Sequence, residues 1–320
     1  MTNSNDYQNV LDNLIENGAH IFGEILSPEG AAELFAKVKE KRSFDENLFI
    51  TEEEYLANPV HVNLNPDQKN NFMNEFEGEF NFIEKDKYLQ SILYKLLGSE
   101  YGTVIKKFVC GVPSVWIPEW VQKRIEGDGV KNLNAYIKPQ FRDITYFNGI
   151  DMHQDMIDWP QGKTNHDPKE FLTLYIYIHD VTELDSPLFV IPKSHKLGAT
   201  QFPHHLKCLD VVSKKWTYHD DAGRKMDCEH EILTGKAGYA AIWHNCTLHG
   251  TQPVAMDDLE LPRMRLSLRY LIYKQDTKEK FGIDEINNHI DGPLSLEKTR
   301  HDLDESGKPV LKKNVINAVK

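Results

Sequence analysis

Residues 170–192 read EFLTLYIYIHDVTELDSPLFVIP, and this stretch decides the fold class. Its two apolar runs are short and rich in β-branched and aromatic residues. The segment between them is polar and contains Asp, Glu, Ser and Pro. Short runs of this composition, bounded by turn-forming residues, are typical of β-strands. The stretch therefore predicts two β-strands that follow one another in the chain.

Similar runs occur on both sides of this stretch, from about residue 101 to residue 275. They are TVIKKFVCG (103–111), NLNAYIKPQ (132–140), GYAAIWHN (238–245) and MRLSLRYLIYK (264–274). The first hundred residues instead predict helices at 7–17, 28–42 and 86–97, with a short acidic helix near 51–56. Ser27 and Pro28 suit the N-cap and first position of the second helix. Short strands after a run of helices indicate an α+β protein built around a β-sandwich or barrel.

The length of 320 residues suits a single domain with extensions. We expect residues 1–100 to form a helical support and lid region, residues 101–275 the strand-rich core, and residues 276–320 a C-terminal extension. The extension is charged and weakly periodic, and no function is assigned to it.

The net charge is −12 and the sequence pI is about 5.6. This balance argues against a nucleic-acid partner, which requires a basic stripe, and against docking on anionic membranes. The N-terminus lacks the basic and apolar regions of a signal peptide, and no apolar stretch is long enough to span a membrane. The four cysteines form no CxxC pair, so a structural zinc site is not expected. These features predict a cytoplasmic protein with reduced thiols.

His153 and Asp155 form a His-x-Asp triplet. On an extended strand, residues i and i+2 point to the same face, so an imidazole and a carboxylate converge there. With a distant histidine they would form a facial triad that holds Fe(II) and leaves coordination positions open for a 2-oxo acid and O₂. Taken alone, the triplet is equally compatible with a polar pair on the surface.

The distant histidine has four candidates, which are His179, His195, His244 and His249. Residues 238–251 read as a strand that leads into a turn at Leu-His-Gly-Thr, and this favours His249. In the strand that follows, Arg265 and Arg269 share one face, and apolar residues occupy the other. Such a face is either exposed and ion-paired, or it points a guanidinium into a barrel to bind a carboxylate.

Together these segments resemble the phytanoyl-CoA dioxygenase (PhyH-like) family of Fe(II)/2-oxoglutarate-dependent oxygenases. The resemblance covers roughly residues 130–275, with a weaker echo in the opening helices. It is carried by HQD at 153–155 followed by Trp159-Pro160, by TELDSPLFVIPKSHKLG at 182–198, and by LHGT at 248–251 followed by Arg265. The middle stretch is the most specific, since relatives carry a similar Pro-Leu-x-Val-x-Pro-Gly-Ser-His-Lys signature.

The resemblance implies a double-stranded β-helix, the cupin-like jelly roll, with supporting N-terminal helices. It implies that His153, Asp155 and His249 ligate Fe(II). It places Arg265 at the distal carboxylate of 2-oxoglutarate and Thr251 beside that carboxylate. Further co-substrate contacts would come from Tyr175 and Asn134, and His195 would be a structural turn residue.

The activity implied by the resemblance is that of a dioxygenase that uses 2-oxoglutarate and O₂, hydroxylates a small molecule, and releases succinate and CO₂. Halogenating relatives have a small residue in place of the aspartate, so Asp155 argues for hydroxylation or a related oxidation. We expect a small polar metabolite as substrate, because no basic cluster for the phosphates of coenzyme A stands out.

The chain departs from the family pattern in places. Asp185-Ser186 and Lys193 replace residues of the usual signature, which indicates a rebuilt turn. The gap between His249 and Arg265 is longer than in many relatives, so Arg269 is an alternative for the carboxylate clamp. Two other functions stay open, namely a cupin-like metalloenzyme that does not use 2-oxoglutarate, and a non-catalytic jelly-roll binding module.

Overall fold

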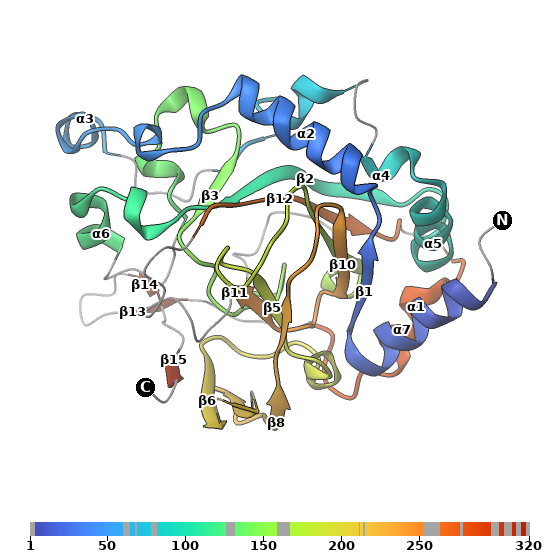
Figure 1. Ribbon diagram of the computed structural model, residues 1–320. Coiled ribbons are helices and arrows are strands. Elements are labelled where there is room, and N and C mark those ends of the chain that lie inside the picture. The colour runs from blue at the N-terminus through green and yellow to red at the C-terminus, as the bar shows by residue number, and fades with distance from the viewer. Residues whose placement is uncertain are drawn as a thin grey trace.

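The fold is given by a computed structural model of the chain (Figure 1). It describes residues 4–59, 65–67, 69–77, 82–125, 132–158, 167–210, 212–213, 215–251, 263–275, 278–295, 301–303, 309–311 and 315–317. The predicted match at Trp159-Pro160 and most of the segment between His249 and Arg265 lie outside these residues.

Most of the described α-helices lie in the first hundred residues, as the capping signals there predict. The helices are α1 (Ser4–Asn17), α2 (Pro28–Lys41), α3 (Glu52–Ala57), α4 (Phe82–Lys85), α5 (Lys87–Leu97), α6 (Glu119–Ile125) and α7 (Gly282–Asn288). The Ser27 hydroxyl accepts the amide of Gly30 at the start of α2, and Thr51 and Glu54 form a capping box at the start of α3. The helices expected at 7–17, 28–42, 51–56 and 86–97 are therefore confirmed, with ends shifted by a few residues.

A six-stranded sheet forms one wall of the core, in the strand order β1-β10-β4-β12-β2-β3. Its strands are β1 (Ala19–Glu24), β10 (Tyr239–His244), β4 (Phe171–Tyr177), β12 (Arg265–Tyr273), β2 (Gly102–Gly111) and β3 (Thr145–Phe147). The second wall is the three-stranded sheet β11 (His249–Thr251), β5 (Leu188–Val190) and β9 (Glu231–Leu233). An antiparallel bridge between His153 and His249 adds the 150–153 segment to this second sheet. These two sheets form the jelly-roll core that the sequence predicted.

The two faces of the large sheet have different roles. Leu266, Leu268 and Tyr270 of β12 point outward into an apolar core shared with the N-terminal helices. Helix α2 crosses this outer side over β2 and β12, and α1, α5 and α7 cluster beside it (Figure 1). The alternate residues, among them Arg265 and Arg269, point inward between the sheets, because successive side chains of a strand face opposite sides. Both arginines of β12 therefore lie on its inner face.

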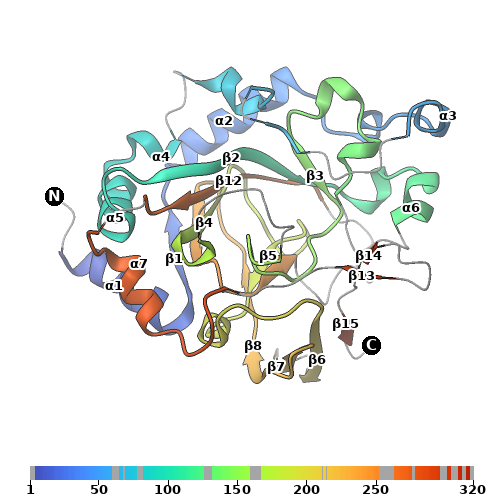
Figure 2. The ribbon, with the colours of Figure 1, turned by 180° about the vertical axis from the view of Figure 1, so that it is seen from behind.

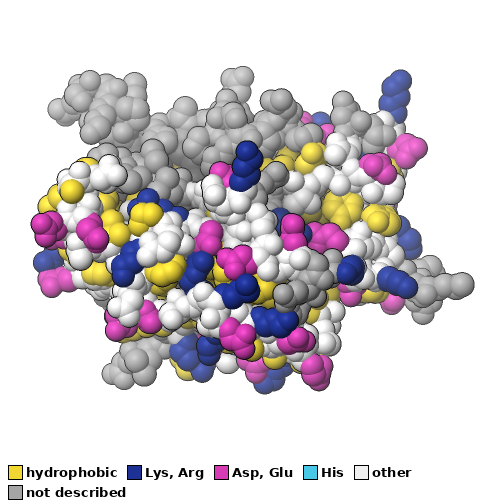
Figure 3. Space-filling view, turned by 90° about the horizontal axis from the view of Figure 1, so that it is seen from above, with side chains coloured by type: hydrophobic (Ala, Val, Ile, Leu, Met, Phe, Trp, Pro, Cys, Tyr) yellow, Lys and Arg dark blue, Asp and Glu magenta, His cyan; other side chains and the backbone are white. Residues whose placement is uncertain are grey.

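A smaller sheet, β15-β6-β7-β8, lies at the far end of the molecule (Figure 2). It consists of β15 (Val315–Asn317), β6 (His204–Asp210), β7 (Lys215–Asp220) and β8 (Lys225–Glu229), and a separate hairpin is formed by β13 (His301–Leu303) and β14 (Pro309–Leu311). On the face drawn in Figure 3, acidic and basic side chains are interspersed over the described residues. None of the described helices is long and apolar enough to cross a membrane.

One expected strand is wrong. Residues 132–140 form short 3-10 turns at Asn134–Tyr136 and Pro139–Phe141 instead. The reason is local hydrogen bonding by asparagine, because the Asn132 side chain accepts the amide of Asn134, and the Asn134 side chain accepts the amide of Tyr146. Pro139 also lacks the amide hydrogen that a strand would use.

Candidate metal centre

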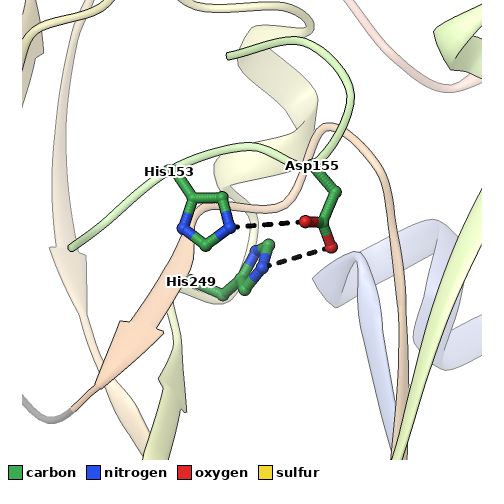
Figure 4. Close-up of side chains that lie close together, drawn as sticks. All are labelled: His153, Asp155 and His249. Carbon is green, nitrogen blue, oxygen red and sulfur yellow. Dashed lines mark ion pairs between the residues drawn. The ribbon is translucent and has the colours of Figure 1, made fainter. Parts of the chain in front are cut away.

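His153, Asp155 and His249 converge between the two sheets (Figure 4). One ligand atom from each lies within 4.8 Å of the other two. Nε2 of His153 is 3.3 Å from Oδ1 of Asp155, and Nε2 of His249 is 3.3 Å from Oδ2 of Asp155. Among the described residues, this is the one cluster of three His, Cys, Asp or Glu residues with spacing suited to a metal ion. The structure thus brings together the three residues that the sequence selected.

The backbone explains why the two histidines meet. His153 and His249 pair across antiparallel segments, with N···O distances of 2.9 and 3.1 Å. Gly250 permits this close approach, because a Cβ atom there would lie 2.8 Å from the carbonyl oxygen of Ile150. Thr251 adds a further tie, since its hydroxyl accepts the amide of Ile150 at 2.7 Å. The LHGT sequence therefore serves both as strand and as support for the ligand.

Hydrogen bonds fix both imidazole rings. Nδ1 of His153 lies 2.7 Å from the carbonyl oxygen of Asp151, and Nδ1 of His249 lies 2.9 Å from the carbonyl oxygen of Thr247. A carbonyl oxygen can only accept, so Nδ1 carries the proton in each ring. Nε2 is then the lone-pair nitrogen, and in both rings it faces Asp155. Metal-binding histidines are oriented in this way.

Asp155 is completely buried and both of its oxygens are engaged. The hydroxyl of Thr173 donates to Oδ2 at 2.6 Å, and Nη2 of Arg269 pairs with Oδ1. Burial alone would raise the pKa of Asp155, but Arg269 and His249 hold that pKa well below its usual range. Burial and the neighbouring His249 lower the pKa of His153. At neutral pH the site is therefore an ionised carboxylate with a neutral imidazole, the protonation states that a divalent metal requires.

Gln154 lies between the first two ligands, and its side chain is buried away from the triad. Its amide nitrogen donates to the carbonyl oxygens of Gly198 at 2.8 Å and Cys246 at 2.6 Å, and its amide oxygen accepts the N–H of Thr200 at 2.8 Å. The backbone N–H of Gln154 donates to Oδ2 of Asp158 at 2.7 Å. Gln154 therefore anchors the turn that carries His153 and Asp155.

Arg265 lies on the inner face of β12 and is 1% exposed. One terminal nitrogen donates to the carbonyl oxygen of Ser186, and its Nε atom has no hydrogen-bond partner within the described residues. No ion pair is formed by Arg265 in the described part of the chain. A buried guanidinium with an unused donor is costly when no anion pairs with it.

Tyr175 and Asn134 were predicted to contact the co-substrate, and the structure places them differently. Tyr175 is on the inner face of β4, stacked on Trp243 with ring centroids 5.3 Å apart, and the Arg269 guanidinium is 5.8 Å from its ring. Asn134 is buried with its amide committed to backbone, donating to Ile144 at 2.7 Å. Tyr175 therefore lies close to the triad through Trp243 and Arg269, whereas the side chain of Asn134 bonds to backbone groups, and the co-substrate contacts of both stay a prediction.

The other candidate histidines do not join the cluster. Nε2 of His195 lies 3.0 Å from the carbonyl oxygen of Ile15, as expected for a structural turn residue. His244 is fully buried at the end of β10, where burial and the nearby His195 lower its pKa to about 3. His179 accepts the amide of Leu266 at 2.8 Å and so supports the start of β12.

Sequence reasoning missed two contacts of the carboxylate ligand. Thr173 is separated from Asp155 by 18 residues, and Arg269 by 114 residues. Neither belongs to a motif, and only the register of β4 and β12, in which Arg269 pairs with Tyr175, brings them to the same carboxylate. The alternation of Arg265 and Arg269 was the only signal in the sequence.

Residues 122–258 match the sequence profile of the family described as Phytanoyl-CoA dioxygenase (PhyH), and this segment contains the whole triad. This segment of the chain therefore resembles a PhyH domain. The match ends before β12, so the two arginines are outside the matched part of the PhyH domain.

One curated protein resembles part of the chain. A probable alpha-ketoglutarate-dependent hypophosphite dioxygenase of Stutzerimonas stutzeri is 29% identical over 108 residues, which are 32% of this chain and 34% of that protein. The chain thus aligns with about a third of this curated relative.

Among the solved structures that resemble this chain, SnoN shares its fold. The epimerase SnoN, in complex with Fe³⁺, alpha ketoglutarate and nogalamycin RO, is 12% identical with a TM-score of 0.50, covering 99% of this chain and 97% of SnoN. EvdO2 from Micromonospora carbonacea var. aurantiaca is also 12% identical, with a TM-score of 0.49 and coverage of 86% and 95%. At 12% identity the likeness to SnoN is one of fold alone.

Proposed function

We propose that this protein is a non-haem Fe(II)/2-oxoglutarate-dependent dioxygenase that hydroxylates a small polar molecule. The observation that carries the proposal is the buried triad of His153, Asp155 and His249 with Nε2 of both imidazoles aimed at the carboxylate. Two histidines and one carboxylate form the facial donor set of non-haem Fe(II) oxygenases. Bound Fe(II) and 2-oxoglutarate would supply the activation of O₂ that oxidises the substrate, with succinate and CO₂ as co-products.

In this proposal the protein holds the reactants and excludes water. His153, Asp155 and His249 would hold the metal. Trp243, whose ring centroid is 4.9 Å from that of His249, packs against the ligand from the inner face of β10. Because the triad is buried between two sheets, the reacting atoms would be shielded from bulk water, which strengthens electrostatic interactions there.

Arg265 is our choice for the clamp on the distal carboxylate of 2-oxoglutarate. A 2-oxo acid that chelates the metal through its keto-acid end holds its other carboxylate several bonds away. Arg269 touches Asp155 itself, whereas Arg265 lies four residues, or about 13 Å, further along the strand on the same face. The spare buried donors of Arg265 therefore fit the distal carboxylate, and Arg269 is too close to the ligands. Thr251 and Tyr175 are proposed to line the same chamber.

We infer the class of substrate from the side chains that surround the triad on the inner face of the large sheet. Its inner face carries buried polar side chains, among them Arg265, Arg269 and Lys107, next to the aromatic pair Tyr175 and Trp243. Such a lining favours a small polar substrate over a long acyl chain. The relatives named for hypophosphite and for nogalamycin RO handle very different molecules, so they do not narrow the class further.

Formation of succinate tests the proposal. The purified protein is incubated in air with Fe(II) and 2-oxoglutarate, and succinate is measured over time. We expect slow formation in the wild type even without substrate, and its loss in His153→Ala and His249→Ala. His219→Ala is the control, because His219 stacks on His205 with ring centroids 4.4 Å apart in the peripheral sheet.

A wild-type rate in either ligand variant would refute the metal assignment. A folded wild type that binds Fe(II) but makes no succinate would favour the cupin-like metalloenzyme that does not use 2-oxoglutarate. A folded wild type that binds neither Fe(II) nor 2-oxoglutarate would favour a non-catalytic binding module.

A further inference from the structure

Arg269 and Thr173 approach the Asp155 carboxylate from the same sheet. Arg269 belongs to β12 and Thr173 to the adjacent β4, and both are on the inner face, two residues apart in the register that pairs Arg269 with Tyr175. His153 and His249 approach the carboxylate from the opposite sheet. Asp155 is therefore held between the two walls of the jelly roll.

Each oxygen of Asp155 faces one imidazole and one group of the large sheet. Oδ1 faces Nε2 of His153 at 3.3 Å and pairs with Nη2 of Arg269. Oδ2 faces Nε2 of His249 at 3.3 Å and accepts the hydroxyl of Thr173 at 2.6 Å. This arrangement fixes the plane of the carboxylate and leaves it no freedom to rotate away from the imidazoles.

We propose that Arg269 is a positioning residue of the metal centre, which holds the carboxylate ligand Asp155 together with Thr173, and that it does not bind the co-substrate. This inference rests on the proposed function, because it takes His153, Asp155 and His249 as the metal ligands. It divides the work of the two arginines of β12, so that Arg265 binds the dicarboxylate co-substrate and Arg269 orients the ligand. Groups that orient a metal ligand typically change metal affinity by about 10-fold to 100-fold when they are removed.

Arginine suits this position better than lysine. Its planar guanidinium lies 5.8 Å from the Tyr175 ring centroid and directs one nitrogen at Asp155, so its orientation is set by the ring as well as by the carboxylate. An ammonium group would keep the charge but lose the fixed direction. Arg269→Lys should therefore retain part of the metal affinity that Arg269→Gln loses.

The experiment separates metal binding from co-substrate binding. Metal-free protein is titrated anaerobically with Co(II), followed by its visible absorption, and then with 2-oxoglutarate at saturating Co(II). The variants are Arg269→Gln, Arg269→Lys and Thr173→Val, and Arg265→Lys is the matched control from the same strand face. Thermal unfolding of each variant verifies that it is folded.

We expect Arg269→Gln and Thr173→Val to weaken Co(II) binding by about 10-fold or more, with Arg269→Lys in between. The affinity for 2-oxoglutarate at saturating Co(II) should change little in these variants. Arg265→Lys should show the reverse pattern. If Arg269→Gln does not fold, Arg269→Lys and Thr173→Val decide the outcome by the same comparison.

Two results would overturn the inference. Weakened 2-oxoglutarate binding with unchanged Co(II) affinity in the Arg269 variants would make Arg269 the clamp, and unchanged affinity for both would show that the contact is without function. Failure of the proposed function has a different signature, because His153→Ala would then bind Co(II) as tightly as the wild type.

Discussion

Nε2 of His204 lies 2.7 Å from Oδ2 of Asp158, and both side chains are fully buried. The same Asp158 oxygen accepts the backbone N–H of Gln154, the residue between two proposed metal ligands. Nδ1 of His204 lies 2.9 Å from the hydroxyl of Tyr218. A buried chain of polar groups thus links the peripheral sheet to the ligand-bearing turn.

These buried hydrogen bonds predict different effects of replacing two adjacent histidines of β6. His204→Ala should lower the free energy of unfolding by about 3 kcal/mol or more, because it removes the imidazole that pairs with the buried Asp158 carboxylate. His205, which is partly exposed and lies 3.0 Å from Asp221, is the matched control. Its replacement by alanine should cost less than about 1 kcal/mol. Urea denaturation measures the free energy of unfolding of both variants. Equal losses would show that the buried hydrogen bonds of His204 add no stability beyond that of the surface pair of His205.

Gln154 predicts a link between stability and metal affinity. Gln154→Leu keeps the volume but leaves the carbonyl oxygens of Gly198 and Cys246 and the amide of Thr200 without their partner. We expect a loss of about 2 kcal/mol or more in unfolding free energy, and weaker Co(II) binding. Gln122→Leu is the control, since its side-chain bond to the carbonyl oxygen of Ile117 at 2.8 Å is close to the surface. Co(II) affinity unchanged in folded Gln154→Leu would contradict the anchoring role.

The buried imidazole of His244 predicts a dependence of stability on pH. Burial and the nearby His195 lower its pKa to about 3, whereas in the unfolded chain it titrates near its ordinary 6.5. Between these values the unfolded state binds a proton that the folded state does not, so stability falls as the pH falls below about 6.5. One such group contributes about 1.4 kcal/mol per pH unit.

His244→Asn tests this contribution, because the asparagine oxygen can still accept the amide of Cys246 that Nδ1 of His244 accepts at 3.2 Å. Urea denaturation at several pH values from 7 to about 4 should give a shallower loss of stability in the variant than in the wild type. Parallel curves would mean that His244 is not kept neutral by the fold.

The fold was accessible from sequence because its elements carry local signals. The capping box of Thr51 and Glu54, and the β-branched and aromatic run at 170–181, specify structure without reference to the rest of the chain. The strand predicted at residues 132–140 is wrong because of local chemistry as well, since their asparagine side chains bind backbone groups that a strand would need. Local chemistry decided both outcomes.

The triad was accessible because His153 and Asp155 are close in sequence and the LHGT turn singled out His249. The separate roles of Arg265 and Arg269 could not be predicted, because the alternation of side chains along a strand puts both residues on the same face. Which arginine meets Asp155 depends on the register between β12 and β4, set by packing across the whole sheet. The partnership of Thr173 with Asp155 has the same origin.

In the proposed function, His153, Asp155 and His249 hold Fe(II) with 2-oxoglutarate bound to it. The most direct measurement is an anaerobic titration of the metal-free protein with Fe(II) and then 2-oxoglutarate, followed by visible absorption. We predict a weak charge-transfer band that requires both additions, is absent in His249→Ala, and needs more 2-oxoglutarate in Arg265→Lys. The absence of a band from folded wild-type protein at saturating Fe(II) and 2-oxoglutarate, or an unchanged band in His249→Ala, would contradict it.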